Sequence, residues 1–452
     1  KGTCQMTDIL VVGAGPAGIS AALTAAKKGA HVTLIDNRPE PGGNIYACLN
    51  STRNHRPEIW KALGSSYREG QELIDGLLSS SVNYLPEHAL WHLDPDGSAS
   101  ARGCGGTLTF EPGKVVLATG AQERPMPMPG WTLPGVIGVG AAQILLKAGG
   151  GLPDGPIIIV GTGPLPLLYA AQVLAVGGKI AAFVEPKSRK NLGLASRHIV
   201  GAWHGKAYLS KGLGYLIKRV LSRIPVYRNA VSIELVGEKC VRGVRFNCGR
   251  DILLDARSVL LHDGVIPNVN PGGAAGLALN RSITQKCWAP ISNDNIVVAG
   301  DAGGILGAKS AKLGGIAAAH TLLGGTVPEW VTNSIGREKK FRSFIDALYP
   351  PVGSANLATD DTTICRCEVV TKKQIYDSAK ASGADPNRLK TNLRCGMGPC
   401  QGRMCALSVE NILAEATGEK RVSIGSHRLR NPIVPITMGD LARSKPAKNR
   451  SR

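Results

Sequence analysis

Five of the eleven cysteines in this 452-residue chain crowd into one segment near its C-terminal end. Cys365 and Cys367 form a Cys-x-Cys pair, and Cys395, Cys400 and Cys405 follow at two equal Cys-x4-Cys spacings. A Cys-x-Cys pair and a Cys-x4-Cys pair can bring four thiolates together, which suits a [2Fe–2S] cluster or a structural zinc ion. Both later spacings qualify, so one of the five thiols is spare, and Cys395 is a candidate for it.

The residues around these cysteines favour a redox cluster. Backbone N–H groups can donate to sulfide or thiolate and tune the reduction potential, and nearby arginines offset negative charge. The glycines are Gly396, Gly398 and Gly402, and the arginines are Arg366, Arg394 and Arg403. Zinc and a set of unpaired reduced cysteines are the alternatives. Beside a flavin domain, which the next pattern indicates, the redox cluster is favoured over zinc.

A second pattern with chemical meaning opens the chain. An apolar run, Ile9–Val12, leads into three spaced glycines, an alanine-rich helical segment, and a β-branched run that ends at Asp36. In such a unit the first glycine permits a tight turn, the second lets backbone N–H groups approach a pyrophosphate, and the third lets helix and strand pack closely. The helix N-terminus favours phosphate, and the acid holds ribose hydroxyls. A glycine turn without a ligand is the alternative. The expected dinucleotide contacts are Gly13, Gly15, Pro16, Ala17, Gly18 and Asp36.

Three further stretches suit the path of a bound dinucleotide. The Pro/Gly loop at 37–44 can cross over a cofactor, and the strand at 114–120 runs into a turn of small residues. The strand at 295–301 ends in an acid before a helix predicted over 311–322, so that Asp301 can hold a ribityl hydroxyl of a flavin. A structural Asp at a strand end is the alternative. The candidate contacts are Asn37, Gly43, Thr119, Gly120, Gly300 and Asp301.

Residues 156–185 repeat the opening pattern in a degraded form. A strand, the turn Gly161-Thr-Gly163, a helix predicted over 167–176, and a second strand ending at Glu185 are all present. Pro166 replaces the third glycine, and its ring prevents the closest helix–strand approach and removes a backbone donor. Glu185 suits a ribose diol better than a 2′-phosphate. A working NADH site and a vestigial site both remain open.

Composition and charge exclude several classes of protein. A hydrophobic fraction of 43% and a charged fraction of 19% are ordinary for a soluble globular protein. No unbroken apolar run reads as a membrane span, and neither a signal-peptide pattern nor an even cysteine number points to a secreted disulfide scaffold. The formal net charge is +20, yet no nucleic-acid recognition motif accompanies it.

The stretch 186–228 is basic throughout and contains neither Asp nor Glu. A solvated surface insert explains it, and so does an anionic partner, either a nucleotide phosphate beside the second unit or an acidic face on another subunit.

The patterns predict an α/β fold with two Rossmann-like dinucleotide-binding domains, a small helical [2Fe–2S] domain and a C-terminal arm. The FAD-binding domain is expected to be split in the sequence. The expected boundaries are 1–122 and 276–345 for the FAD-binding domain, 123–275 for the second nucleotide-binding domain, 360–415 for the cluster domain, and 416–452 for the arm and basic tail.

Together the motifs carry a family resemblance. Gly13-x-Gly15-x-x-Gly18, Ala118-Thr-Gly120 and Gly300-Asp301 resemble the flavoprotein disulfide-reductase superfamily over residues 7–323. Neither nucleotide domain holds a Cys-x-x-Cys or similar redox pair, so disulfide reduction is not expected. The segment 365–405 resembles the [2Fe–2S] domain of the bacterioferritin-associated ferredoxin type. The whole order, including residues 129–135 and the closing arm from 428, resembles the α subunits of heteromeric opine oxidases, hydrogen cyanide synthase and proline or hydroxyproline dehydrogenases.

This resemblance implies specific cofactors and a partner. A separate flavoprotein of the D-amino-acid-oxidase type, the β subunit, would oxidise the C–N bond of an amino acid or opine. The present chain would relay electrons through FAD and the cluster to an acceptor such as a quinone. Pro166 puts pyridine-nucleotide chemistry in doubt, but a structural adenine nucleotide can still bind the second unit, on Gly161, Gly163 and Glu185. The implied FAD residues are Gly13, Gly15, Gly18, Asp36 and Asp301, and the implied cluster ligands are Cys365, Cys367, Cys400 and Cys405.

The sequence therefore predicts an electron-transfer subunit of a dehydrogenase that acts on CH–NH or CH–NH2 donors. None of the nine His residues falls in a catalytic or metal-ligand arrangement, so the cofactors carry the chemistry. Two alternatives stay open: a self-sufficient NADH-dependent flavin reductase that reduces its own cluster, and a non-catalytic scaffold stabilised by a nucleotide and zinc. We expect a cytoplasmic hetero-oligomer without nucleic acid, and association with the inner face of the membrane stays open.

Overall fold

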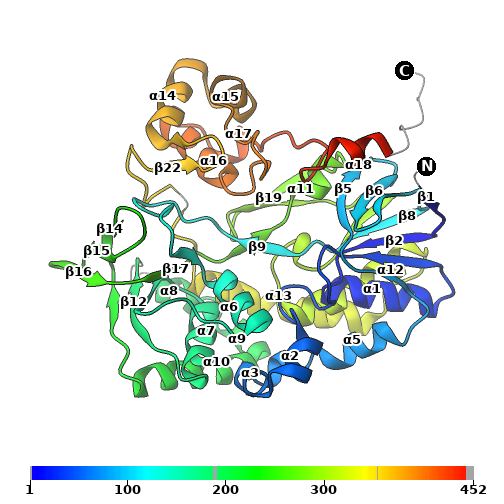
Figure 1. Cartoon of the computed structure of the whole chain (residues 1–452), viewed down its shortest axis with the longest axis horizontal. Helices are drawn as coiled ribbons and strands as arrows, with labels where there is room; N and C mark the ends of the chain where they lie inside the picture. Colours follow the sequence, from blue (N-terminus) through cyan, green and yellow to red (C-terminus); the bar gives the residue numbers. More distant parts are fainter. Residues whose placement is uncertain (1–2, 187–190, 354, 444–452) are drawn as a thin grey trace.

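The computed structural model describes residues 3–186, 191–353 and 355–443 (Figure 1). Two bodies, each built around a sheet, lie side by side in the view of Figure 1, and a small helical module rests above the second of them. This arrangement confirms the predicted α/β fold with two nucleotide-binding units and a separate helical domain.

The first body is built on a parallel sheet with the strand order β21-β8-β2-β3-β4. Its central strand β2 is buried at every residue and pairs with β3 on one side and β8 on the other. Strand β21 comes from far along the chain and pairs with β8, so the predicted split of the FAD-binding domain is confirmed. The strands are β2 (Ile9–Val12), β3 (Val32–Ile35), β4 (Asn83–Leu85), β8 (Lys114–Leu117) and β21 (Ile296–Val298).

Two helices from the two halves of this domain pack closely against each other. They are α1 (Pro16–Lys27) and α12 (Ala308–Leu322). A Cβ atom on Gly315 would lie 2.0 Å from the carbonyl oxygen of Ala17, so only glycine allows the two backbones to come this near. Helix α12 begins three residues before the predicted helix. The other helices are α2 (Leu49–His55), α3 (Pro57–Leu63), α4 (Ser65–Arg68), α5 (Gln71–Leu78), α11 (Asn270–Ala274) and α13 (Glu329–Leu348).

A second sheet of the first body has the order β1-β7-β6-β5, and β5, β6 and β7 form consecutive antiparallel hairpins. Its strands are β1 (Thr3–Gln5), β5 (Ala89–Leu93), β6 (Ala99–Gly103) and β7 (Gly106–Phe110).

The second body is a parallel sheet of order β10-β17-β11-β12-β13 with a three-stranded antiparallel sheet, β14-β15-β16, beside it. The strands are β10 (Val136–Gly138), β11 (Ile157–Gly161), β12 (Ile180–Glu185), β13 (Val226–Arg228), β14 (Val231–Val236), β15 (Gly243–Asn247), β16 (Asp251–Asp255) and β17 (Ser258–His262). The helices are α6 (Val139–Gly149), α7 (Pro164–Ala175), α8 (Asn191–Ser196), α9 (Ile199–Ala202) and α10 (Lys206–Leu221).

Two antiparallel strands connect the bodies, since β9 leaves the first domain where β18 returns to it. The buried Arg124 follows β9, and its guanidinium donates to the carbonyl oxygens of Lys286 and Gln285. These bonds tie the crossing to the turn at 285–286. The strands are β9 (Ala121–Glu123), β18 (Val265–Pro267), β19 (Leu279–Ser282) and β20 (Cys287–Pro290).

The C-terminal module has a hydrophobic core of its own, which includes Ile364, Ile375 and Ile412. Thr371 caps α14 through a capping box with Gln374, as its Thr-Lys-Lys-Gln sequence favours. After the module, the arm crosses back to the first body, where the backbone N–H of Ile433 donates to Trp91. The elements are β22 (Thr363–Cys365), β23 (Val370–Thr371), α14 (Lys372–Ser382), α15 (Pro386–Leu393), α16 (Ala406–Thr417), α17 (Arg421–Ile424) and α18 (Met438–Arg443).

Candidate cofactor sites

The glycine turn after β2 leaves no room for side chains. Gly13 has a φ of +103°, and a Cβ atom there would lie 2.4 Å from the carbonyl oxygen of Ala118. A Cβ atom on Gly18 would lie 1.8 Å from the carbonyl oxygen of Gly13. Gly13 and Gly18 therefore serve the tight turn and the close helix–strand contact that the sequence predicted.

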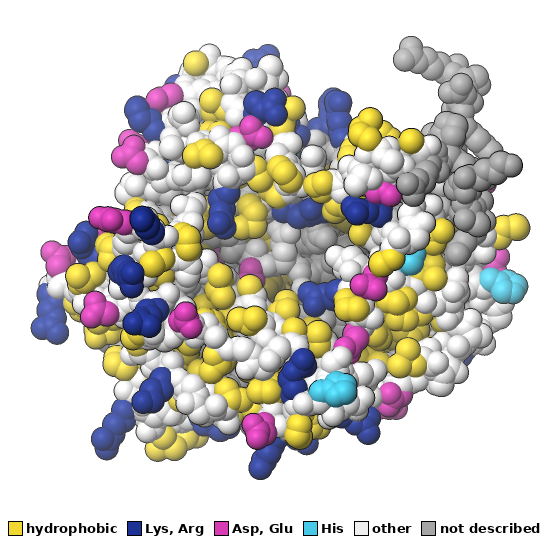
Figure 2. All heavy atoms as spheres, viewed as in Figure 1, with side chains coloured by type: hydrophobic (Ala, Val, Ile, Leu, Met, Phe, Trp, Pro, Cys, Tyr) yellow, Lys and Arg dark blue, Asp and Glu magenta, His cyan; other side chains and the backbone are white. Residues whose placement is uncertain are grey.

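A cavity of about 730 Å³ opens beside this turn. Figure 2 shows this face of the molecule hollowed near its centre, below the C-terminal module, where Figure 1 places β9. Of the predicted FAD contacts, those that line the cavity are Gly13, Gly15, Pro16, Ala17, Asp36, Asn37, Gly43, Thr119, Gly120 and Asp301. Gly18 and Gly300 lie outside its lining.

The backbone itself forms a cradle at the cavity wall. Gly43 has a φ of +61°, and a Cβ atom on it would lie 2.9 Å from the Cα of Gly15. The loop after β3 thus closes against the helix N-terminus at the place where the sequence predicted a pyrophosphate. Because Gly15 and Gly43 have no side chains, a dinucleotide can approach the backbone closely here, and the residues present fit FAD.

Asp36 directly follows β3 and lines the cavity, and its hydrogen bonds hold the glycine turn together. Its carboxylate accepts hydrogen bonds from the backbone N–H of Ala14 at 2.6 Å and of Arg38 at 2.8 Å. Burial raises the pKa of this carboxyl group, and the two N–H bonds and the Arg38 charge oppose that shift. A buried carboxylate at this position is the expected partner of a ribose hydroxyl.

Asp301 has a structural task in addition to the predicted one. One carboxylate oxygen accepts from the backbone N–H of Leu306 at 2.9 Å and of Gly307 at 3.0 Å, just before α12 begins. Beside it, Gly300 has a φ of +67°, and a Cβ atom there would lie 2.6 Å from the Cβ of Ala17. The acid therefore shapes the loop that carries it to the cavity wall.

The second body supplies polar residues to the same cavity, which the sequence did not indicate. Lys147 on α6 is 3% exposed, and its ammonium group donates to the carbonyl oxygens of Asn44 and Ile45 and to Gln143 at 2.9–3.1 Å. Gln143 donates in turn to Gln172 on α7. Burial, and to a lesser degree Arg38, lowers the pKa of Lys147 to about 7. A lysine in an amphipathic helix gives no sequence signal of such a role.

The degraded second unit does form the predicted strand–turn–helix, and Leu165, Leu168 and Gln172 of its helix line the cavity. Its predicted contacts Gly161, Gly163 and Glu185 lie outside the lining. A Cβ atom on Gly161 would lie 1.9 Å from the carbonyl oxygen of His262, and Gly163 precedes α7, which begins at Pro164 rather than at the predicted position 167. The Glu185 carboxylate forms ion pairs with Arg219 at 3.5 Å and with Arg228 at 3.6 Å. Glu185 is therefore already paired with two arginines of the basic stretch 186–228.

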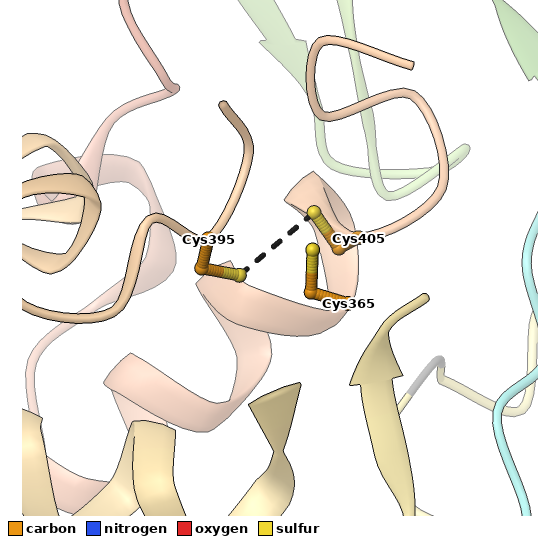
Figure 3. Close-up of side chains that lie close together, drawn as sticks. All are labelled: Cys365, Cys395 and Cys405. Carbon is orange, nitrogen blue, oxygen red and sulfur yellow. Dashed lines mark hydrogen bonds between the residues drawn. The ribbon is translucent and has the colours of Figure 1, made fainter. Parts of the chain in front are cut away.

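The five clustered cysteines come together in the C-terminal module. The sulfur atoms of Cys365, Cys395 and Cys405 all lie within 4.8 Å of one another, and all three residues are buried (Figure 3). They come from the end of β22, from the loop after α15, and from the residue before α16. Hydrogen bonds from Cys395 and Cys405 lower the pKa of Cys365 to about 2, and the same bonds raise the pKa values of the two donors.

Cys367 and Cys400 form a second group at the more exposed edge. Burial raises the pKa of the Cys367 thiol, and the neighbouring Cys400 is the residue that otherwise influences it most, its backbone N–H opposing the shift and its side chain adding to it. The four cysteines implied as ligands thus fall into two pairs, Cys365 with Cys405 and Cys367 with Cys400. Because a [2Fe–2S] cluster binds four thiolates, two on each iron, the donor set fits this cluster. The Gly396 backbone also donates to Cys365, as predicted for a glycine in this loop.

Side-chain contacts join the cysteine loop to the FAD cavity. Arg403 lies two residues before Cys405, and it also lines the cavity. Its backbone carbonyl accepts from Gln122 at 2.9 Å, and its guanidinium donates to Ile433 of the arm at 3.3 Å. The predicted flavin and cluster sites are therefore adjacent, because the loop that carries Cys400 and Cys405 also lines the cavity.

No helix in the described residues is long and apolar enough to cross a membrane. The predicted association with a membrane surface stays a prediction.

Comparison with known proteins agrees with this geometry. The family model of pyridine nucleotide-disulphide oxidoreductases matches residues 7–321, and that of the BFD-like [2Fe-2S] binding domain matches residues 363–415. The A subunit of opine oxidase from Agrobacterium tumefaciens (strain Ach5) is 37% identical, with 96% of this chain and 91% of the relative aligned. The HcnB subunit of hydrogen cyanide synthase from Pseudomonas protegens is 29% identical, with 94% and 96% aligned. The crystal structure of L-proline dehydrogenase from P. horikoshii has a TM-score of 0.71 at 20% identity, over 98% of this chain and 80% of that one.

Proposed function

Because the chain belongs to the pyridine nucleotide-disulphide oxidoreductase family and is similar to the A subunit of opine oxidase over nearly its whole length, we propose that it is the electron-transfer subunit of a heteromeric dehydrogenase. The donor would be an amino acid or an opine, whose C–N bond is oxidised on a partner subunit. A flavoprotein β subunit of the D-amino-acid-oxidase type is the proposed partner, and a quinone is the proposed acceptor.

One observation carries this proposal: a glycine-cradled cavity and a cysteine cluster lie next to each other in one chain. The cavity measures about 730 Å³, and Arg403 of the cysteine loop lines it. When bound, FAD and the [2Fe–2S] cluster supply redox centres for two electrons and for one. The side chains of this chain hold the two groups, set the distance between them and keep the space between them packed.

Arg403 and Gln122 fix the loop against the cavity. Burial lowers the pKa of Arg403, and the charge of Cys400 opposes that shift. This half-buried guanidinium lines the cavity two residues before Cys405, so its positive charge would stabilise negative charge that the bound groups gain on reduction. The chain's own contribution is therefore orientation and electrostatic stabilisation, with no side chain acting as acid or base.

Anaerobic mixing experiments test the proposal. The chain, co-expressed with a β subunit of the D-amino-acid-oxidase type, is mixed with candidate amino acids and opines, while flavin absorbance and the electron paramagnetic resonance of the cluster are followed. We expect one class of substrate to reduce both groups in the complex and neither group in this chain alone. Prompt bleaching of the flavin by NADH alone would instead support the self-sufficient reductase. Zinc without iron or sulfide would support the scaffold.

We further propose that the second unit holds an adenine nucleotide structurally. Its glycine turn is preserved, although Pro164 and Pro166 remove two backbone donors from the first turn of α7. The exposed Arg228 side chain beside Glu185 offers positive charge to phosphates. Mass analysis of nucleotides released from the denatured protein tests this proposal. We expect an adenine nucleotide in addition to FAD, and FAD alone would contradict it.

We also propose that the chain docks on anionic membrane surfaces through α9 and α10. Apolar side chains along this segment are exposed, among them Val200 at 80%, Trp203 at 76% and Leu221 at 76%. In α10 the exposed apolar residues recur at helical spacing, as Leu209, Leu213, Ile217 and Leu221. Exposed basic residues, including Lys206 and Lys218, flank them, and the stretch contains no acid. An apolar stripe with basic flanks is typical of helices that lie in a membrane interface.

A further inference from the structure

We propose that Trp131 is a positioning residue of the cluster site, which holds the guanidinium group of Arg366 in place beside the cluster and thereby raises the reduction potential of the cluster. This inference rests on the proposed [2Fe–2S] site. It assigns a task to the loop at 129–135, a part of the family resemblance that neither cofactor site uses. Trp131 acts through Arg366, whose charge is the group that stabilises the reduced cluster.

The second body holds the loop of Trp131 near both of its ends. The backbone N–H of Leu235, on β14, donates to the carbonyl oxygen of Pro129 at 2.9 Å. The backbone N–H of Val241, between β14 and β15, donates to the carbonyl oxygen of Pro134 at 2.9 Å. The Trp131 side chain is 5% exposed and belongs to the hydrophobic core of this body. Its position is therefore fixed by the second body and not by the cluster module.

Trp131 contacts the cysteine hairpin in two ways. Its indole N–H donates to the carbonyl oxygen of Thr363, on β22, at 2.7 Å. The guanidinium carbon of Arg366 lies 5.4 Å from the centroid of its ring, which is the range of a cation–π interaction. Thr363 lies two residues before Cys365, and Arg366 lies between Cys365 and Cys367. One side chain therefore holds the hairpin on both sides of Cys365.

The other end of the cysteine segment rests on the same body. Met404, the residue before Cys405, packs together with Leu357 against the hydrophobic core that includes Trp131. The sulfur atoms of Cys365 and Cys405 lie in the buried group of thiols (Figure 3). Two of the segments that supply this group thus lie against the second body, and Trp131 contacts the one that carries Arg366.

The charge of Arg366 is available to the cluster. Among the residues that the structure describes, Arg366 forms no ion pair, whereas the nearby Arg394 pairs with Glu368 at 3.0 Å. The reduced cluster carries one more negative charge than the oxidised one, so a cation held beside it favours reduction and raises the potential. Arg366 is exposed, so the effect is modest and decreases as salt screens the charge. A guanidinium that is free to swing into solvent stabilises the reduced cluster less.

Single substitutions test the proposal in the full chain. The readouts are iron and acid-labile sulfide per chain, the electron paramagnetic resonance spectrum of the reduced cluster, and its potential by spectroelectrochemical titration at low and high salt. We expect Arg366→Gln to keep the iron and sulfide content of the wild type but to have a lower potential, with a smaller difference at high salt. Arg250→Gln, at an exposed arginine between β15 and β16, is the matched control and should keep the wild-type potential.

Substitutions of Trp131 in two backgrounds test whether it acts through Arg366. We expect Trp131→Leu to lower the potential, and Trp131→Phe, which keeps a weaker aromatic face, to lower it less. In the Arg366→Gln background neither substitution should lower it further, because the group that Trp131 holds is already absent. Trp131→Phe decides the question alone if Trp131→Leu does not fold.

Two results would overturn the proposal. A wild-type potential in Arg366→Gln would show that this charge does not act on the cluster. Equal shifts from the Trp131 substitutions in both backgrounds would show that Trp131 supports the fold without acting through Arg366. Both results leave the proposed function intact, since the wild-type chain would still contain a cluster. Failure of the proposed function is recognised separately, because the wild-type chain would then lack iron and sulfide.

Discussion

At the scale of single residues, a substitution at Gly15 is expected to weaken cofactor binding without disturbing the fold. A Cβ atom there would meet only the Cα of Gly43, at 3.8 Å, so a side chain is tolerated by the fold but points into the cavity. We expect Gly15→Val to lose FAD affinity at least tenfold, about 1.4 kcal/mol, while the apoprotein keeps its fold. Flavin absorbance per chain and circular dichroism measure the two effects. Gly105→Val, at a position with open space around it, is the matched control. Full flavin content in Gly15→Val would place the dinucleotide elsewhere.

Lys147 is the residue at which pH should act on stability. The ammonium group has a pKa of about 7 in the folded chain, against an ordinary value of 10.5, because burial disfavours its charge. Between these two values the unfolded chain binds a proton that the folded chain lacks, so this group makes the free energy of unfolding rise with pH. Below pH 7 both states are protonated, and the full cost of burying the charge remains.

A substitution isolates this contribution of Lys147. We expect the stability of the wild type relative to Lys147→Met to increase from pH 7 to pH 9, as measured by denaturant unfolding at each pH. The exposed Lys218→Met serves as the control, with a pH profile parallel to that of the wild type. If the stability of the wild type and of Lys147→Met changed with pH in parallel, the lowered pKa of Lys147 would be contradicted.

At the scale of elements, one buried ion pair holds the cluster module on the first body. Glu410 of α16 accepts from Arg281 of β19 at 2.6 Å and from the Trp288 indole of β20 at 2.7 Å. The side chains of Arg281 and Glu410 are 8% and 3% exposed. We expect Glu410→Ala to cost about 3–5 kcal/mol, because it leaves a buried guanidinium unpaired. Denaturant unfolding and limited proteolysis of the 349–362 link measure the loss.

A second glutamate on the same helix provides the control for this prediction. Glu415 pairs with Lys372, but its side chain is 52% exposed. We expect Glu415→Ala to cost less than about 1 kcal/mol, as exposed pairs do. Equal costs for the two variants would show that burial is not what makes the Glu410 pair strong.

At the scale of the whole molecule, the proposed docking of α9 and α10 on a membrane surface predicts vesicle binding that depends on anionic lipid. Figure 2 shows hydrophobic and basic side chains together at the lower edge, where Figure 1 places α10. We expect flotation with vesicles of phosphatidylcholine and phosphatidylglycerol, but not with phosphatidylcholine alone, and weaker flotation at high salt. Leu213→Glu should abolish flotation, whereas Leu253→Glu, on β16 and 57% exposed, should not. Loss of β-subunit binding in Leu213→Glu, with flotation unchanged, would identify an interface with the partner instead.

The sequence by itself determined the features that depend on short stretches of chain. The spacing of Gly13, Gly15 and Gly18 before Asp36 specifies a turn whose geometry is local, so both the turn and its acid could be predicted. The split of the parallel sheet could also be predicted, because β2, β3, β8 and β21 each run into a small-residue turn or an acid. The number and type of the clustered cysteines likewise limited the metal chemistry before any contact was known.

Only the tertiary structure decided which distant residues share a site. Lys147 reaches the loop at 44–45 from about a hundred residues away, and Arg403 meets Gln122 across an even longer separation. The two equal Cys-x4-Cys spacings could not say where the spare thiol lies, and the folded loop puts Cys395 within 4.8 Å of Cys365 and Cys405. The physical reason is that backbone preferences act over a few residues, whereas burial and hydrogen bonding pair groups wherever packing brings them together.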